Sequence, residues 1–521
     1  MATPELEDFL RATKVLEALA EDRTLLTRLD EPQRVALLIA AGRVSRPQRN
    51  EVVRTAKAFR RIARKNVQDA DRDARASTGI RVARLAPVFV PPPLLEGGKP
   101  KAEEALPREL ANARACYVCK TEFRRLHFFY DSMCTACGDL NYQKRSQTAS
   151  LEGRVALITG ARIKIGYQAA LMMLRAGARV LVTTRFPRDA AARFAREPDF
   201  SAFADRLRVY GLDLRHSPSV ELFARYLTRT ESRLDILINN AAQTVRRPPG
   251  FYAHMLDLEI RPDAALPPEL RQVLRGHEEC KASLPGVPGL MAADATRFAI
   301  PEGGHSTGIV GFRGASPALG IHASASLSQI ASAYDDVSRD HELFPEGQSD
   351  ADLQQVDLRA VNSWRLTLGD VPSPEMLEVQ LVNAVAPFIL ASKLKQLMMR
   401  DRTDAKHIVN VSAIEGQFAR RTKTDKHPHT NMAKAALNMM TYTSAPEYAA
   451  SGIFMNAVDT GWVTDEDPAA LAARKREMHD FQPPLDIVDG AARICDPFFS
   501  GLLTGVHVHG KFLKDYVPVA G

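Results

Sequence analysis

Hydrophobic residues in the first 80 positions recur every three or four residues, which is the period of an amphipathic helix. The pattern begins after Thr3 and Pro4, a pair typical of a helix start, and a second segment, RVALLIAAGRV, ends near Gly42. A third segment carries an apolar stripe beside several arginines and lysines. Residues 1–80 are therefore predicted to form a helical region. The stripe consists of Val52, Ala56, Phe59 and Ala63.

A different pattern follows this helical region. Residues 81–107 are rich in proline and glycine, which indicates a linker. Residues 108–148 then contain two C-x-x-C pairs, and two such pairs can fill all four positions around one tetrahedral zinc ion. This segment is predicted to be a small zinc ribbon with a structural ion, and redox-active dithiols are the alternative. The four cysteines are Cys116, Cys119, Cys134 and Cys137.

Two basic stretches in residues 1–147 are each open to two interpretations. The arginines and lysines of the third helical segment form either a solvated face, which we favour, or a surface for nucleic acid or an acidic protein. Basic and aromatic residues occur together in residues 124–130 of the ribbon. They either fill the core of the ribbon, which we favour, or stack on nucleic-acid bases.

From residue 149 the chain alternates between two patterns. Short β-branched runs such as RVALITG, RVLVTTR and LDILINNAA predict strands, and helical segments such as YQAALMMLRAGA separate them. Repeated alternation of strand and helix is typical of an α/β protein with a doubly wound parallel sheet. The chain is therefore predicted to contain a Rossmann-like domain.

Seven motifs in this region resemble, in order, those of the short-chain dehydrogenase/reductase family. The resemblance covers roughly residues 150–250 and 373–521, which would be the two halves of the domain, at 149–250 and 373–521. It implies binding of NAD or NADP and hydride transfer to or from a substrate. The motifs are TGARIKIG at 159–166, Asp213 in GLDL, NNAA at 239–242, Asn383, Ser412, Lys434 and NAVDTGWVTD.

The resemblance also implies which residues contact the dinucleotide. They come from the first turn, from the ends of the next strands and from the last motif. These are Thr159, Gly160, Arg162, Lys164, Ile165, Gly166, Thr184, Arg185, Asp213, Leu214, Asn240, Ala241, Lys434, Gly461 and Thr464. Asp213 stands where the family has an aspartate that contacts adenine.

Departures from the family pattern favour NADP(H). Lys164 replaces the middle glycine of the first turn, and a basic residue at this place also resembles the pteridine-reductase branch of the family, which binds NADPH. Arg185 stands where NAD-preferring members carry an acid, and an arginine can pair with a 2′-phosphate. Thr460 replaces the proline of the last motif, which weakens the expected contact with the nicotinamide amide.

The resemblance implies Ser412, Lys434 and Asn383 as members of a catalytic group whose tyrosine is missing. Residues four apart share a helix face, so the tyrosine position is occupied by Thr430. A threonine hydroxyl is far less acidic than a phenol and cannot take over proton transfer. Tyr442 lies about 18 Å further along an ideal helix and is out of reach.

Two other groups are candidates for the proton transfer. His427 and His429 directly precede the helix, and an imidazole is a suitable acid–base group at neutral pH. His429 is the better placed, although a solvent or capping role is the alternative. Lys434 with a pKa lowered by burial is the second candidate.

Residues 251–372 are predicted to be an insertion that covers the site. The family resemblance places Asn240 and Asn383 much closer in sequence than the 143 positions seen here. In doubly wound sheets ligands bind outside the carboxyl ends of the strands, so an insertion at this point leaves from the rim of the site. Arg246 and Arg247 at its base either bind an anionic substrate or form ion pairs.

Composition adds limited information about the setting of the protein. The net charge of +7 is mild for 521 residues, and no run approaches the roughly 18 apolar residues of a membrane span. Six cysteines are too few for a disulfide scaffold and suggest a reducing, cytoplasmic compartment. No membrane partner is therefore expected, while the resemblance implies a homo-oligomer.

The sequence leaves three functions open. The favoured one is an atypical NADP-dependent oxidoreductase acting on an unknown, possibly anionic substrate. The alternative is a catalytically silent dinucleotide-binding sensor or scaffold that engages a protein or nucleic acid through residues 1–147. The third is a non-redox enzyme on the same scaffold. Loss of the tyrosine favours the silent protein, whereas retention of Asn383, Ser412 and Lys434 favours the enzyme.

Overall fold

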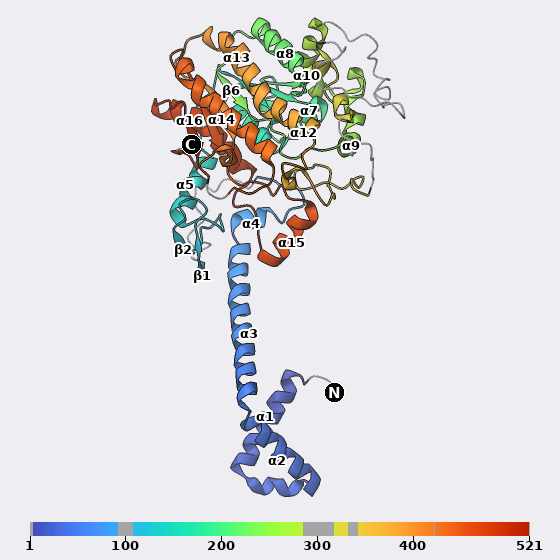
Figure 1. The fold of residues 1–521 in the computed structure, drawn as a ribbon, viewed down its shortest axis with the longest axis vertical. Helices are drawn as coiled ribbons and strands as arrows, with labels where there is room; N and C mark the ends of the chain where they lie inside the picture. The colour runs from blue at the N-terminus through green and yellow to red at the C-terminus, as the bar shows by residue number, and fades with distance from the viewer. Residues whose placement is uncertain (1–3, 92–107, 285–316, 332–341, 421–422, 520–521) are drawn as a thin grey trace. The chain divides into compact units, whose positions relative to one another are not determined.

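A computed structural model describes residues 4–91, 108–284, 317–331, 342–420 and 423–519 (Figure 1). The chain divides into two compact units, Met1–Arg72 and Asp73–Gly521. The division falls a few residues before the boundary expected at residue 80, because the segment after Arg72 packs with the second unit.

The first unit consists of helices, as predicted. They are α1 (Leu6–Glu21), η1 (Arg23–Arg28), α2 (Glu31–Ser45) and the first part of α3 (Arg49–Ala76). Aspartate side chains cap two of them: Asp22 accepts a hydrogen bond from the Thr24 amide and Asp30 accepts one from the Gln33 amide. None of the described residues 4–72 is buried, so this unit has no hydrophobic core of its own.

The second unit begins with the cysteine-containing segment. Here α4 (Gly79–Ala83) precedes an antiparallel pair, β1 (Glu109–Ala115) and β2 (Glu122–Arg125), and then α5 (Thr135–Arg145). Phe129 and Tyr130 are buried, and Phe129 packs edge-on against Tyr130. The predicted core role of these aromatic residues is thereby confirmed.

An eight-stranded sheet forms the centre of the second unit. Its spatial order is β10-β9-β8-β7-β6-β3-β4-β5, and all neighbours are parallel except β10 and β9. The doubly wound parallel sheet is therefore confirmed. The strands are β3 (Val155–Thr159), β4 (Arg179–Thr184), β5 (Leu207–Gly211), β6 (Ile236–Asn239), β7 (Lys406–Ser412), β8 (Ile453–Asp459), β9 (Phe512–Lys514) and β10 (Val517–Val519).

Helices cover both faces of this sheet (Figure 1). Strands covered on both faces are apolar throughout, which explains the continuous rather than alternating hydrophobic runs of β3 and β6. One face carries α6 (Lys164–Arg175), α7 (Pro187–Phe194) and α16 (Ile487–Thr504). The other carries α8 (Ser217–Thr230), α13 (Ala386–Met399) and α14 (Pro428–Ala449).

One helical run among the described residues, Ser373–Met399, is long and apolar enough to cross a membrane by composition. Half of its most apolar window is buried, and Leu390, Leu394 and Leu397 are fully enclosed against α8 and the sheet. Its apolar character is accounted for by this packing. The run comprises α12 (Ser373–Gln380), the π-helical turn η9 (Leu381–Val385) and α13.

The described parts of the insertion play two roles. Helix α10 packs beside β5 and adds Leu270 and Val273 to the core, so this part is a structural layer rather than a lid. Other parts reach the carboxyl ends of the strands, as described below. The glycine-rich stretch at 302–320 lies mostly outside the described residues. The elements are α9 (Pro249–Glu259), η4 (Asp263–Ala265), α10 (Pro268–Ser283), α11 (Leu319–His322), η6 (Ser326–Gln329) and η8 (Ser363–Arg365).

Three short elements complete the second unit. They are η3 (Phe200–Ala202), η10 (Ile414–Gly416) and α15 (Ala469–His479). The last of these lies in the connection between β8 and α16, and this connection passes both the strand ends and the cysteine-containing segment.

Candidate dinucleotide and catalytic site

The turn between β3 and α6 brings two glycines close to the end of β6. Gly160 has φ +68°, and a Cβ atom there would lie 2.7 Å from the Ala241 Cα atom. A Cβ atom at Gly166 would collide with the Asn240 side chain. Glycine is required at both positions by backbone conformation or by close approach. The Thr159 hydroxyl fixes the facing strand end by accepting hydrogen bonds from the Asn240 and Ala241 amides.

A cavity of about 350 Å³ opens at these strand ends. Its lining includes twelve of the fifteen residues expected to contact a dinucleotide. Thr159, Gly461 and Lys434 do not line it. The twelve are Gly160, Arg162, Lys164, Ile165, Gly166, Thr184, Arg185, Asp213, Leu214, Asn240, Ala241 and Thr464.

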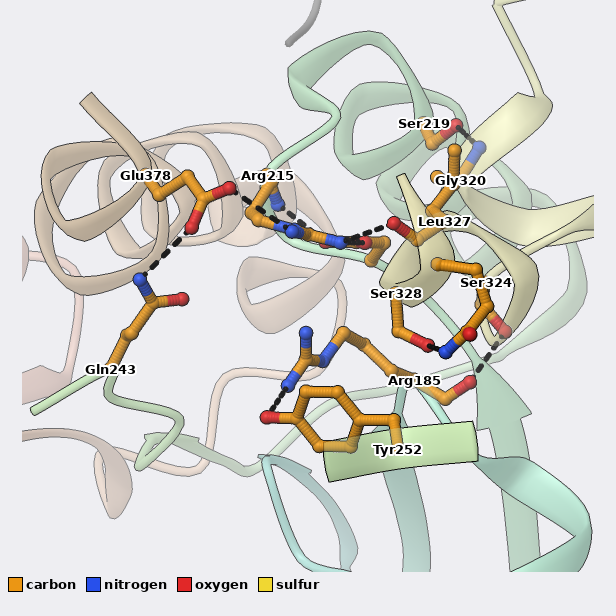
Figure 2. Close-up of polar contacts among 12 residues, drawn as sticks. Arg185, Arg215, Ser219, Gln243, Tyr252, Gly320, Ser324, Leu327, Ser328 and Glu378 are labelled. Atoms are coloured by element: carbon orange, nitrogen blue, oxygen red, sulfur yellow. Dashed lines mark hydrogen bonds and ion pairs between the residues drawn. The ribbon is translucent and has the colours of Figure 1, made fainter. Parts of the chain in front are cut away.

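Arg185 projects from the end of β4 toward the insertion (Figure 2). Its Nη2 atom donates a hydrogen bond of 2.7 Å to the Tyr252 hydroxyl, and its guanidinium lies 4.6 Å from the centre of that ring. Ser324 donates a hydrogen bond to the Arg185 carbonyl. Sequence analysis did not identify Tyr252, because a residue within an insertion has no motif to mark it.

Asp213 is held by hydrogen bonds within the protein. The Arg215 guanidinium donates to both of its carboxylate oxygens, with Nη2 at 2.7 Å from Oδ2. Burial opposes ionisation of Asp213, yet the neighbouring Arg215 holds its pKa below the usual value. The Asp213 amide donates to the Gly320 carbonyl. The carboxylate is thus engaged within the protein, and the contact with adenine implied by the resemblance stays a prediction.

The other cations of the cavity are paired with carboxylates. Arg162 lies 2.7 Å from Asp189, and Lys164, with the left-handed φ of +55°, lies 3.8 Å from Asp352 of the insertion. Glu466 also lines the cavity. Burial alone would raise the pKa of Glu466. The positive charge of nearby Lys164 and other neighbours outweigh this effect, so the pKa lies below its usual value. The sequence did not indicate Asp352 or Glu466.

The two arginines at the base of the insertion form ion pairs. Arg246 Nε lies 3.1 Å from Glu378 Oε2, and Arg247 pairs with Asp357. Of the two roles considered, the ion pair is therefore the one observed. Glu378 also accepts a hydrogen bond from Gln243 and bonds Arg215, so it links the insertion base to Arg215, the partner of Asp213 (Figure 2).

Ser412, Lys434 and Thr430 are not among the residues that line this cavity, and all three are buried. The Ser412 hydroxyl at the end of β7 donates to Asn438 Oδ1 at 2.6 Å, and Lys434 Nζ donates to the Val411 carbonyl at 2.8 Å. Burial lowers the pKa of Lys434 to about 8. Among the described residues, the Thr430 hydroxyl has no hydrogen-bond partner.

Asn383 occupies the π-helical turn η9 and binds the backbone of one residue twice. Its Oδ1 atom accepts from the Gln243 amide at 2.7 Å, and its Nδ2 atom donates to the Gln243 carbonyl at 3.1 Å. This places Asn383 as a support for the chain after β6, which lines the cavity. Single π-helical turns often occur at functional sites.

The two histidines have different surroundings. Only His427 precedes α14; His429 lies within its first turn, because the helix already begins at Pro428. His427 has φ +42°, its ring stacks on Trp364 with 3.9 Å between ring centres, and it contacts the Asn431 side chain, so its side chain has a packing role and does not cap the helix. His429 is buried, and its Nε2 atom lies 3.2 Å from Glu375 Oε1 on α12. Glu375, which the sequence did not indicate, places a buried carboxylate next to His429, although no hydrogen bond joins the two side chains within the described residues. Tyr442 is 72% exposed, in agreement with its exclusion.

The four cysteines come together as predicted. Their Sγ atoms all lie within 4.8 Å of one another, although the pairs are separated by residues 120–133 and are carried by different elements. Four thiolates at such distances suit a tetrahedral zinc ion. The geometry therefore suggests a structural metal site.

The chain was compared with solved structures and curated proteins. An NADP-bound putative NAD(P)-dependent gluconate 5-dehydrogenase from Beutenbergia cavernae is 18% identical, with a TM-score of 0.39 over 70% of this chain and 96% of that chain. Uncharacterized protein R665 of Acanthamoeba polyphaga mimivirus is 28% identical over 397 residues, 74% of this chain and 71% of the relative. Dehydrogenase/reductase SDR family member 13 of Bos taurus is 42% identical over 94 residues, 18% of this chain and 24% of the relative.

Family models match both sides of the insertion. Residues 154–256 match the model described as short chain dehydrogenase, and residues 360–484 match the one described as Enoyl-(Acyl carrier protein) reductase. The two matched segments contain strands β3 to β8, and the second also contains Asn383, Ser412 and Lys434. The chain spans about a quarter of the length of the animal relative, so that protein's activity is not transferred here. The chain therefore matches the short-chain dehydrogenase/reductase family on both sides of the insertion.

Proposed function

We propose that this protein is an NADP(H)-dependent oxidoreductase with an unusual proton donor. The observation that carries the proposal is Arg185 at the end of β4. Within the described residues its guanidinium bonds a phenol rather than a carboxylate, so its charge is available to a phosphate. The glycine turn and the cavity supply the remaining requirements for a dinucleotide.

In this proposal the chain's residues divide the work. Bound NADP(H) would supply the hydride, with Arg185 holding the 2′-phosphate and the turn from Gly160 to Gly166 meeting the pyrophosphate. Thr430 cannot supply the proton, because an aliphatic hydroxyl is too weak an acid. His429 is the group we assign to proton transfer, since an imidazole is a suitable acid–base group at neutral pH and its Nε2 atom lies 3.2 Å from the Glu375 carboxylate.

Binding of NADPH and NADH, followed by nucleotide fluorescence, tests the cofactor assignment. We expect NADPH to bind more tightly, and Arg185→Asp to weaken NADPH binding at least tenfold, since an acid at this place repels the 2′-phosphate. Arg196→Asp, which makes the same charge change at an exposed position, is the control. Equal binding of both nucleotides, or no loss in Arg185→Asp, would contradict the proposal.

A second candidate is a dinucleotide-binding protein without turnover. It is favoured by the burial of Ser412, Lys434 and Thr430 away from the cavity wall. The two candidates differ in the fate of bound NADPH when it is mixed with a panel of aldehydes, ketones and conjugated carbonyl compounds. Oxidation by one of them, lost in Glu375→Gln with binding intact, supports the enzyme. Stable bound NADPH throughout the panel supports the silent protein.

We further propose that the four cysteines bind one structural zinc ion, to be checked by metal analysis of the purified protein. One equivalent of zinc, lost together with heat stability in Cys116→Ser, is the expected result. A homo-oligomer, a cytoplasmic location and a protein or nucleic-acid partner for residues 1–147 remain predictions.

A further inference from the structure

The first cysteine pair lies directly against the connection that follows β8. Tyr117, between Cys116 and Cys119, accepts a hydrogen bond of 2.9 Å from the Trp462 amide. Its hydroxyl also lies 3.1 Å from the place that a Cβ atom at Gly461 would occupy. A side chain of the cysteine-containing segment therefore sets the position of the backbone at Gly461, where φ is +74°.

The same connection is held at its other end. Arg84, just after α4, donates hydrogen bonds to the Pro483 and Leu485 carbonyls at 2.6 and 2.7 Å. Arg81 of α4 pairs with Asp480 at 3.2 Å and with Asp131 next to the second cysteine pair. Residues 461–485 are thus fixed at both ends by residues that precede the sheet in sequence.

A shared hydrophobic core joins the two regions. Val463, Leu485 and Ile487 pack in one buried cluster with the cysteine-containing segment. Buried polar contacts strengthen the junction at the start of α16, where Tyr130 donates to Asp489 and Arg145 pairs with Asp486 at 2.7 Å. The members of the cluster from the cysteine-containing side are Ile80, Leu110, Cys116, Phe123, Leu126, Phe129, Tyr130, Met133 and Tyr142.

The connection fixed in this way also forms part of the cavity. Thr464 and Glu466 line it, and their side chains are joined by a hydrogen bond of 2.6 Å. Only the residue Val463 separates Trp462, whose amide binds Tyr117, from Thr464. A displacement of the first cysteine pair would therefore reach the cavity wall through only two residues of backbone.

We propose that the four-cysteine segment is a positioning element for the cavity, with Tyr117 as the positioning residue. Zinc bound by the cysteines would hold Tyr117, and Tyr117 holds Gly461–Glu466 in the conformation that accepts the dinucleotide. Zinc occupancy and nucleotide affinity are then coupled, and the coupling is the same in both directions. The inference rests on the proposed nucleotide binding, and it gives the segment a role within this chain rather than toward a macromolecule.

The first test compares Tyr117→Phe with Tyr442→Phe in the full chain, since Tyr442 is exposed on a sheet-covering helix. Tyr117→Phe removes one hydrogen-bonding oxygen and leaves all four cysteines. We expect unchanged zinc content, NADPH affinity about three- to tenfold weaker, and faster amide exchange in residues 461–466. Unchanged affinity and exchange with zinc retained would overturn the proposal. Tyr442→Phe should change none of the three quantities.

The second test follows zinc and nucleotide together in the wild-type protein. Removal of zinc with a chelator should speed amide exchange in residues 461–485, and saturating NADPH should slow the release of zinc. Zinc release at the same rate with and without bound NADPH would contradict the coupling. Failure of the zinc-loaded protein to bind any dinucleotide would instead reject the proposed function, while the exchange of residues 461–466 in Tyr117→Phe still decides whether Tyr117 positions this segment.

Discussion

The cofactor end and the catalytic end of the candidate site differ in how their expected residues are arranged. At the cofactor end, the glycine turn and the strand ends line a cavity with most of the residues that the family pattern requires. At the catalytic end, Ser412, Lys434 and Asn383 are present, yet each is bonded to the protein itself and buried. Binding a dinucleotide depends on backbone shape and an open space, whereas proton transfer depends on a donor that reaches the substrate.

The two ends also differ in how much their buried charged and polar groups lower the stability of the fold. The cofactor end places its cations beside carboxylates or, for Arg185, beside a phenol, so few charges are left uncompensated. The catalytic end keeps a buried lysine with a lowered pKa and a threonine hydroxyl without a partner among the described residues. Such groups lower stability, so the catalytic end is the more costly of the two.

The largest effect is expected at the glycine turn. Gly160→Val forces a side chain against the Ala241 backbone at a positive φ, so we expect loss of NADPH binding and unfolding free energy lower by about 3 kcal/mol. Gly153→Val is the matched control, because Gly153 has φ +71° with nothing within 4 Å of an added Cβ atom. It should show only the smaller cost of backbone strain. Denaturant unfolding and nucleotide titration measure both effects, and equal behaviour of the two variants would show that the turn tolerates side chains.

The next effect concerns the buried lysine and its dependence on pH. Burial lowers the folded-state pKa of Lys434 to about 8 from its usual value of 10.5. Between these values the unfolded chain binds more protons, so the contribution of Lys434 to stability rises with pH across this range. Lys434→Met should therefore be more stable than wild type below about pH 8, by up to roughly 3 kcal/mol. The difference should shrink by pH 10, as unfolding curves at several pH values would reveal. A stability difference that does not change with pH would mean that the pKa of Lys434 is not lowered in the folded protein.

The smallest effect on stability is expected for two replacements of Thr430. Thr430→Val keeps the shape and removes a buried hydroxyl without a partner, so we expect stability equal to or about 1 kcal/mol above wild type. Thr430→Tyr restores the family's residue in a closed space and should lower stability by about 1–3 kcal/mol. Thermal unfolding of both variants measures this. A stable Thr430→Tyr with new turnover would show that the catalytic end opens more widely than its packing indicates.

Much of the architecture was readable from local patterns. The β-branched runs, the helical periods, the glycine turn and the cysteine spacing predicted the parallel sheet, the turn and the four-cysteine cluster, which the structure confirms. The insertion was harder, because α10 follows a helical pattern whether it forms a lid or, as observed, a layer beside β5. A hydrophobic stripe predicts that a face is covered, but not which element covers it.

The sequence alone therefore determined the sheet and twelve of the residues that line the cavity, because these depend on the local conformation of short segments. Tertiary structure decided which partner each polar group has. Tyr252 next to Arg185, Glu375 next to His429 and Tyr117 next to Trp462 are separated in sequence by 67, 54 and 345 positions. Such pairs are selected by the packing of whole elements, and no local pattern records the contact.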